Sequence, residues 1–147
     1  MNETGALYVR GGSTAQALST AYAKMTGWAT RGDSSYYVDG NYGIRADLSQ
    51  DRFSLLAGRY LVMVSISATS DAADIGITAA LHVDGVEEVD GICVCESEAA
   101  SKNDLNFVIS TVVILSSPQA LDVRLKSASS TPTVTPTNAH FTVVRLD

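Results

Sequence analysis

Residues 51–67 read DRFSLLAGRYLVMVSIS, and this stretch decides the fold class. A short polar segment that ends at Phe53 leads into a tight corner at Ala57-Gly58, and a long run of alternating side chains follows. That run has two faces: Tyr60, Val62, Val64 and Ile66 on one, and Leu61, Met63, Ser65 and Ser67 on the other. Because successive side chains of a strand point to opposite faces, the run predicts a long β-strand with the first face in the core.

The rest of the chain carries similar strand signals, separated by turns. Further strands are expected at residues 75–83, 86–95, 107–115, 120–126 and 139–146. Asp84-Gly85 is a strong hairpin signal, and Asp90-Gly91 predicts a bulge or second turn in the returning strand. Residues 127–138, rich in Ser, Thr and Pro, are expected to form a loop. With no confident helix, the pattern predicts an all-β sandwich or barrel.

Residues 107–115 are the most apolar segment, with the sequence FVISTVVIL. A strand with so little alternation is typical of one that is covered on both faces. We therefore expect this strand to be buried on both sides, either in the sandwich core or against another subunit.

Composition narrows the classes of partner. The chain has 147 residues, which suits a single domain with one core. Only 18 % of the residues are charged, so much of the surface is neutral and suits packing against other subunits. The formal net charge of −6 and the scattered Lys and Arg residues disfavour nucleic acid and anionic membranes as partners.

The first residues differ in character from the remainder. Residues 1–20 are predicted to form an extended N-terminal arm held by a neighbouring subunit, and residues 21–147 to form the sandwich domain. The start of the chain lacks the basic and apolar regions of a signal peptide. We therefore expect synthesis in a cytoplasm without export.

Cys93 and Cys95 are the only cysteines. Two residues apart in a strand, they share one face with their Cα atoms roughly 6.5–7 Å apart, at or beyond the limit for a disulfide. We interpret them as small buried thiols in a reducing compartment. A metal or redox pair, the alternative, would need further ligands that the sequence does not supply.

Several short motifs resemble functional sites. His82-Val83-Asp84 with His140 downstream has the pattern of a non-haem iron triad, but Asp84 is better explained by the hairpin turn. Arg31-Gly32-Asp33 is read as an ordinary turn rather than an adhesion tripeptide. Residues 70–74, 96–104 and 127–138 are interpreted as polar surface loops, with calcium or sugar binding as the alternative.

No nucleophile elbow, phosphate loop or zinc spacing is present in the sequence. We predict that the chain is not an enzyme and uses no cofactor or metal.

The order of these strands resembles the jelly-roll domain of the tumour necrosis factor (TNF) and complement C1q families, which also occurs in many phage virion proteins. The resemblance covers residues 44–147, with Ser117-Pro118-Gln119 standing where the family usually has a Gly-Asp turn. The segments that carry it are Phe53, Ala57-Gly58-Arg59-Tyr60, Leu81-His82-Val83-Asp84-Gly85, residues 107–115, residues 120–125 and residues 141–146. The resemblance implies a single-domain jelly-roll β-sandwich that forms a homotrimer.

A trimer needs an interface, and the sequence suggests where it lies. The start of the long strand is too apolar on its second face for free solvent, the tyrosine-rich turns offer aromatic contacts, and the N-terminal arm offers more. The predicted interface residues are Leu7, Tyr8, Leu18, Tyr36, Tyr37, Tyr42, Leu61 and Met63.

These expectations favour a structural role. The leading hypothesis is a phage capsid decoration (cement) protein, a homotrimer made in the host cytoplasm that binds the major capsid protein and stabilises the outer surface of the virion head. The alternative is a head-fibre or tail-tip knob that binds a host glycan or receptor. The absence of aromatic residues from the outer loops predicted downstream of residue 66 counts against the knob.

Overall fold

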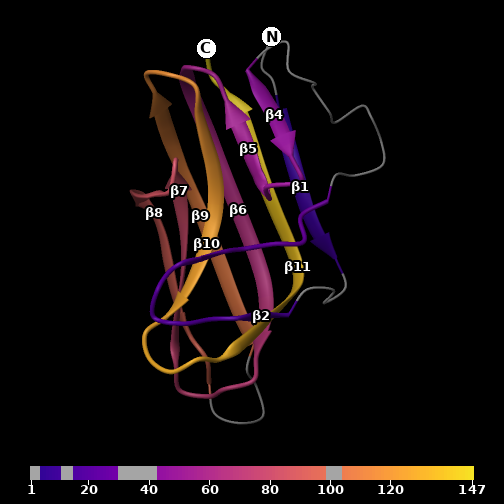
Figure 1. Ribbon diagram of the computed structural model, residues 1–147, viewed down its shortest axis with the longest axis vertical. Coiled ribbons are helices and arrows are strands. Elements are labelled where there is room, and N and C mark those ends of the chain that lie inside the picture. Colours follow the sequence, from indigo (N-terminus) through magenta and orange to yellow (C-terminus); the bar gives the residue numbers. More distant parts are fainter. Residues whose placement is uncertain (1–3, 11–14, 30–42, 99–103) are drawn as a thin grey trace.

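The computed structural model describes residues 4–10, 15–29, 43–98 and 104–147. These form two antiparallel sheets that face each other (Figure 1). Sheet A contains β1 (Thr4–Arg10), β11 (Thr133–Arg145), β6 (Gly58–Ser70) and β9 (Asp104–Leu115) in that order, with β2 (Gln16–Ala17) beside β11. Sheet B contains β4 (Ile44–Asp47), β5 (Arg52–Leu55), β10 (Gln119–Ser127), β7 (Gly76–Val83) and β8 (Val86–Glu96), with β3 (Ala23–Lys24) beside β10.

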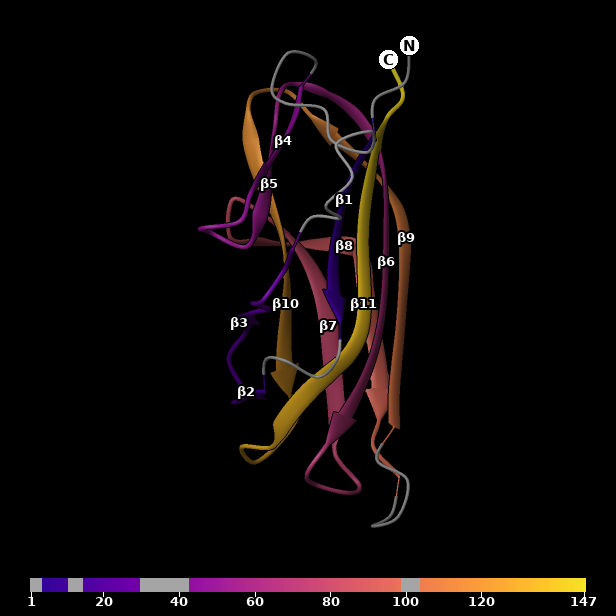
Figure 2. The same cartoon turned by 90° about the vertical axis from the view of Figure 1, so that its right-hand side faces the viewer.

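The chain crosses between the sheets repeatedly. From β5 it passes to β6 in sheet A, returns to the β7–β8 hairpin in sheet B, and then alternates through β9, β10 and β11. The two layers are separate in the second view (Figure 2). Apart from the β4–β5 and β7–β8 pairs, the paired strands of the two longer paths are distant in sequence, so the order is that of a jelly roll rather than of a meander. No helix in the described part of the chain could span a bilayer.

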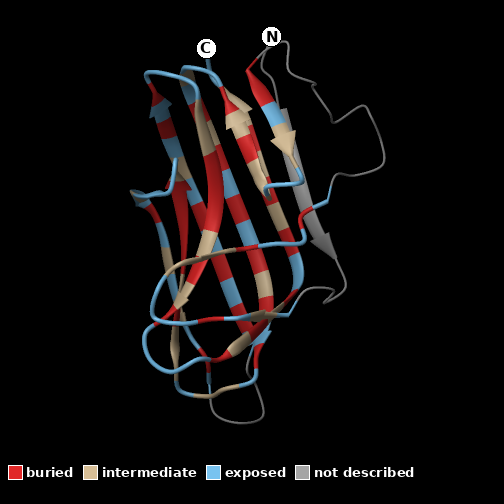
Figure 3. Ribbon diagram, viewed as in Figure 1, coloured by how far each residue is buried: buried red, intermediate tan, exposed pale blue. Residues whose placement is uncertain are grey.

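The core lies between the sheets and is lined by the expected face of β6. Tyr60, Val62, Val64 and Ile66 are all buried, which confirms the alternation predicted for this strand (Figure 3). Phe141 joins the two layers, because its ring packs edge-on against Phe53 of sheet B with centroids 4.9 Å apart. Tyr60 is the core aromatic residue of β6 that carries a hydroxyl. This buried group has a partner, because Tyr60 Oη donates a 2.8 Å hydrogen bond to the carbonyl oxygen of Leu56.

The predicted hairpin and bulge are both present in sheet B. Asp84 and Gly85 have φ angles of 47° and 82°, as a two-residue turn with left-handed backbone requires. Between Ala80 and His82 the register with β8 shifts, and Gly91 lies in the extra loop of that strand. The predictions at Asp84-Gly85 and Asp90-Gly91 are therefore confirmed.

The last strand begins earlier than predicted. Residues 133–138 were expected to belong to a loop, but β11 starts at Thr133 and pairs with β6 from that point, Val134 lying opposite Ser70. Thr133, Val134 and Thr135 alternate between half-buried and buried positions, so the segment has a strand pattern despite its Pro. Pro136 is accommodated where the β11–β6 register shifts, a place at which a missing N–H is tolerated.

The prediction that residues 107–115 are buried on both faces is wrong for the single chain. The strand β9 alternates: Phe107, Ile109, Val113 and Leu115 are buried in the core. The other face carries Val108, Val112 and Ile114, which are 70 %, 49 % and 73 % exposed. The alternative, that this outer face packs against another subunit, stays a prediction.

The predicted N-terminal arm is not separate from the sandwich. Strand β1 pairs with β11 from Thr4 opposite Val144 to Arg10 opposite Asn138. Leu18, predicted at an interface, is instead 2 % exposed in the core of its own subunit, and its N–H donates to the carbonyl oxygen of Pro132 at 2.8 Å. The small, neutral composition of residues 11–21 gave no sign that this single Leu would be a core residue.

The bulge in β8 gives the first prediction, at Gly91. A Cβ added there would lie 2.9 Å from both Cβ and Cδ1 of the fully buried Leu81, so the neighbouring strand would have to move. We expect Gly91→Ala to lower the free energy of unfolding by about 1–3 kcal/mol, as overpacked cores do. Urea unfolding followed by circular dichroism measures this.

Gly76→Ala is the matched control for this substitution. Its added Cβ meets only the Cβ of Ala128, at 3.4 Å, and its backbone has no positive φ. We expect a change of less than about 1 kcal/mol. Equal effects of the two substitutions would show that the Gly91–Leu81 contact is not the constraint.

Candidate assembly face

The face of sheet A that points away from sheet B carries a band of apolar side chains. We call Leu61 and Met63 of β6 with Val108, Val112 and Ile114 of β9 the apolar band. The two strands are neighbours, and the register sets Leu61 opposite Val112 and Met63 opposite Ser110. Met63 is 39 % exposed and Leu61 is half-buried. The band is therefore continuous across two strands and faces solvent in the single chain.

Small and weakly polar side chains extend this face toward β11. Thr142 lies opposite Met63 and His140 lies opposite Ser65. A shallow depression of about 270 Å³ lies on this face, lined by Met63, Val64, Ser65, Val108, Ile109, Ser110, His140 and Thr142. The lining contains no Lys, Arg, Asp or Glu, so a partner that covers it would desolvate no formal carboxylate, ammonium or guanidinium charge there.

A face of this kind is costly to leave in water. Large apolar side chains exposed singly are common on monomers, but a contiguous band across adjacent strands marks an interaction surface. Burial of apolar area contributes roughly 25 cal/mol per Å² to association before the ordering costs are subtracted. This face can therefore bind a partner by excluding water from its apolar side chains.

The predicted interface residues have different positions. Leu61 and Met63 belong to the apolar band. Leu7 and Tyr8 are in β1, opposite Phe141 and His140 in register. Tyr36, Tyr37 and Tyr42 lie outside the described residues.

Sequence analysis missed three members of the band: Val108, Val112 and Ile114. A signal for them existed, because residues 107–115 place Phe107, Ile109, Val113 and Leu115 on alternate positions from these three. Because the whole segment was interpreted as one apolar run, the alternation of inward and outward positions along the strand was overlooked. The exposure of these three side chains, with Val112 opposite Leu61 on the outer face of β6, shows that the second set faces outward.

The corresponding face of sheet B is polar over β10 and β3, whereas β8 at its edge exposes Ile92 and Val94. Asp122 of β10, with its side chain 5 % exposed, forms ion pairs with Arg124 at 2.7 Å and Lys24 at 3.3 Å. His82 lies opposite Asp122 in register and is also buried. The ring of Tyr22 covers His82 edge-on, with centroids 4.6 Å apart. These contacts tie the segment that leads into β3 onto sheet B.

Burial shifts the pKa values of His82 and Tyr22 in this cluster. Removal of water from the imidazole lowers the pKa of His82, with the nearby Arg124 adding to the effect. The same desolvation, with Glu87 beside the hydroxyl, raises the pKa of Tyr22 far above its usual value. His82 is therefore a neutral packing residue at pH 7.

The iron-triad pattern does not converge in space. His82 is in β7 of sheet B, whereas His140 is in β11 of sheet A. Asp84 occupies the hairpin turn, where its Oδ1 accepts a 2.7 Å hydrogen bond from the N–H of Ala120. In the described part of the chain no three His, Cys, Asp or Glu side chains are grouped as metal ligands.

The two cysteines are free thiols on the inner side of β8. The Sγ of Cys95 donates to the carbonyl oxygen of Asn106 in β9 at 2.6 Å, which links the edges of the two sheets. Burial, with the adjacent Cys93 thiol, raises the pKa of Cys95. A protonated, half-buried thiol of this kind is a weak nucleophile, so its chemistry favours packing.

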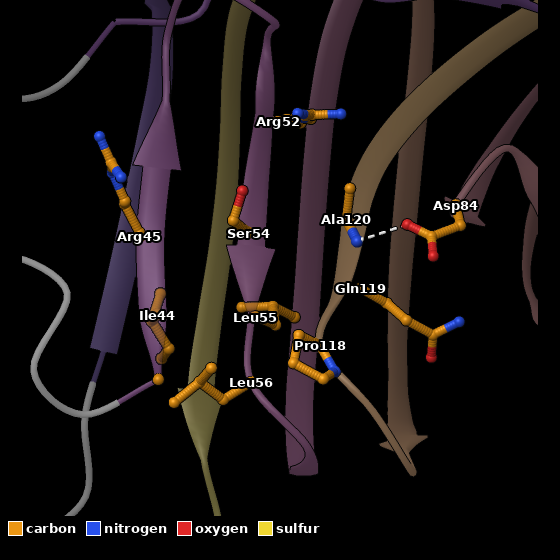
Figure 4. Close-up of a pocket in the computed structure, with 11 residues that line it drawn as sticks. Ile44, Arg45, Arg52, Ser54, Leu55, Leu56, Asp84, Pro118, Gln119 and Ala120 are labelled. Carbon is orange, nitrogen blue, oxygen red and sulfur yellow. Dashed lines mark hydrogen bonds between the residues drawn. The ribbon is translucent and has the colours of Figure 1, made fainter.

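A second hollow lies on the outer side of sheet B, with a volume of about 460 Å³. Figure 4 shows Ser54 and Ala120 at its centre and Arg52 on one side of them. Leu56 and Pro118 lie on the opposite side, and Arg45 and Asp84 lie at the two flanks (Figure 4). We call this hollow the β5–β10 pocket.

Comparisons with known proteins identify the fold only. No protein-family model matches the chain, and no curated protein matches it. Among solved structures, Eiger TNF from S. frugiperda aligns with a TM-score of 0.67 over 99 % of this chain and 94 % of that chain. The fold is a TNF-like jelly roll. The sequence identity is 16 %, so the likeness shows the fold alone.

The buried imidazole gives the second prediction. Because the pKa of folded His82 lies below the ordinary value of 6.5, the unfolded state binds the proton more readily. Stability is then lost as the pH falls below about 6.5, by at most about 1.4 kcal/mol per pH unit. We expect His82→Gln to flatten the dependence between about pH 7 and 5.5, measured by urea unfolding.

The other histidine supplies the control for this titration. His140→Gln, on the outer side of sheet A, removes the other imidazole of the chain and is compared over the same pH range. If His82→Gln retains the full slope while His140→Gln loses it, the assignment to His82 is wrong.

Proposed function

We propose that this protein is a phage capsid decoration protein, a homotrimer that binds and stabilises the outer surface of the head shell. The observation that carries the proposal is the apolar band on sheet A, which the single chain leaves in solvent. A protein that exposes a contiguous apolar band on a flat sheet face is suited to assembly rather than to catalysis. We therefore propose no catalytic role.

Other copies of the chain are the proposed occupants of the band. The likeness to TNF-family jelly rolls is compatible with self-association, and the sequence resemblance implied a trimer. A stable contact between subunits buries about 800 Å² per partner. The band together with the uncharged face toward β11 supplies an apolar centre for such a contact.

The shell is the proposed second partner. A trimer presents three identical surfaces at once, and linked weak contacts gain affinity through effective concentration. The two free thiols suit a chain made and kept in a reducing cytoplasm, where virion proteins assemble. The major capsid protein is the shell component that such a decoration protein would contact.

The third prediction tests the subunit interface. Met63→Asp places a charge in the centre of the apolar band, where an interface would have to desolvate it. We expect the solution mass, measured by light scattering after gel filtration, to fall from three chains to one. Because Met63 is 39 % exposed, we expect the unfolding free energy of the subunit to change by only about 1 kcal/mol or less.

Leu48→Asp is the control for Met63→Asp. Leu48 is 41 % exposed and lies in the turn between β4 and β5 of sheet B, so the chemical change and the exposure are matched. This variant should keep the mass of the unmodified protein. A Met63→Asp protein that remains a trimer, or an unmodified protein that is a monomer, would refute the proposed interface.

The fourth prediction concerns the particle. On a decorated head, mass spectrometry with copy-number counting should find hundreds of copies of this chain per virion. The purified trimer should co-sediment with heads that lack it, and the Met63→Asp monomer should bind them much more weakly because avidity is lost. A handful of copies at the tail would instead assign the protein to the alternative, a head-fibre or tail-tip knob.

A further inference from the structure

The β5–β10 pocket lies on the opposite side of the sandwich from the apolar band. It is built by β4, β5, the turn after β7 and the start of β10, all of sheet B (Figure 4). Subunits that meet through sheet A would leave it open to solvent. Its volume of about 460 Å³ falls in the range of small-ligand sites.

Two guanidinium groups give the pocket an anion-binding side. The Nε atom of Arg52 is buried without a hydrogen-bond partner, and its one ionic contact is with an Asp47 oxygen at 3.4 Å. Arg45, one strand further out and exposed, has no ionic partner among the residues that the structure describes. A guanidinium offers a planar pair of donors that matches a carboxylate.

The opposite flank supplies acceptors. Asp84 Oδ1 is fixed by the N–H of Ala120 at 2.7 Å, which holds the carboxylate at the rim of the pocket. Its second oxygen can accept a hydrogen bond from a ligand hydroxyl. Ser54 and Gln119 add a hydroxyl and an amide, which both donate and accept.

The remaining wall is apolar. Leu56 is 47 % exposed and lies beside Pro118 (Figure 4). These side chains offer a surface for aliphatic C–H groups. A ligand that fits the whole lining therefore has a carboxylate at one end, several hydroxyls at the other and a non-aromatic carbon frame between them.

We propose that the β5–β10 pocket binds an acidic monosaccharide unit, such as a uronate or a sialate, through Arg52 and Arg45. The carboxylate lies against the Arg52 guanidinium, Arg45 adds positive charge at the flank (Figure 4), and the ring hydroxyls donate to Asp84 and exchange hydrogen bonds with Ser54 and Gln119. The site does not depend on the decoration role, since it uses sheet B alone. It gives the particle surface an affinity for anionic glycans.

Saturation-transfer NMR on the full-length protein tests the site. The probes are free glucuronate, galacturonate and N-acetylneuraminate, with glucose and galactose as neutral partners of the first two. We expect saturable binding of at least one acidic sugar below about 20 mM and no binding of its neutral partner. Raising the salt concentration should weaken binding, because the charged side is partly exposed.

Three variants and one control locate the binding. Arg52→Gln should weaken it at least tenfold, the loss expected for a charge-assisted hydrogen bond, and Arg45→Gln, which removes a positive charge from the flank, should weaken it by a smaller factor. Arg59→Gln is the matched control, because Arg59 pairs with Asp147 away from the pocket, and it should bind as the unmodified protein does. Asp84→Asn keeps an oxygen for the Ala120 N–H and should lower affinity by a smaller factor. Circular dichroism confirms that each variant is folded.

Several results would overturn the proposal. They are no saturable binding of any acidic sugar, equal binding of acidic and neutral sugars, or binding that survives both arginine substitutions. Acetate or alanine binding as tightly as the uronates would show that the pocket recognises a carboxylate without the sugar. None of these results bears on the subunit mass or on the copy number, so failure here is distinct from failure of the decoration proposal.

Discussion

Strand β6 holds sheet A together, because it is hydrogen-bonded along both edges. It pairs with β11 from Ser70 to Tyr60 and with β9 from Gly58 to Thr69. With both edges occupied, the register of all three strands is fixed, and a slip of one residue would move Tyr60 and Val64 into solvent. The same register sets Leu61 and Met63 beside the outer side chains of β9. The core and the apolar band are two consequences of one alternating strand.

Local sequence signals were sufficient where polar and apolar residues alternate clearly along a strand and where a turn has special backbone needs. The inner face of β6 and the Asp84-Gly85 turn could be read from residue order alone. Thr133–Asn138 could not, because Ser, Thr and Pro favour loops locally, and only pairing with the long β6 makes a strand there. Leu18 was misjudged for a similar reason, since its burial depends on the carbonyl of Pro132, which is distant in sequence.

The candidate sites were harder to predict than the fold. Val108 and Ile114 look like core residues in sequence, and nothing local distinguishes a face covered by the opposing sheet from one left open. The β5–β10 pocket is assembled from four separate segments, so its two arginines and Asp84 have no common motif. Such a site becomes visible only when the sheet order sets β4 and β5 beside β10.

The two outer faces of the sandwich differ in chemistry, and this difference separates their proposed roles. Sheet A presents Met63, Val108 and Ile114, whose burial needs no counter-charge. Over β10, sheet B presents Asp122 paired with two cations, Arg124 and Lys24, and only its edge strand β8 exposes apolar side chains, Ile92 and Val94 among them. A partner that covered this second face would gain little from charges that are already paired, and it would have to desolvate them. The proposed self-association is therefore placed on sheet A, an arrangement that would leave the β5–β10 pocket of sheet B open to solvent.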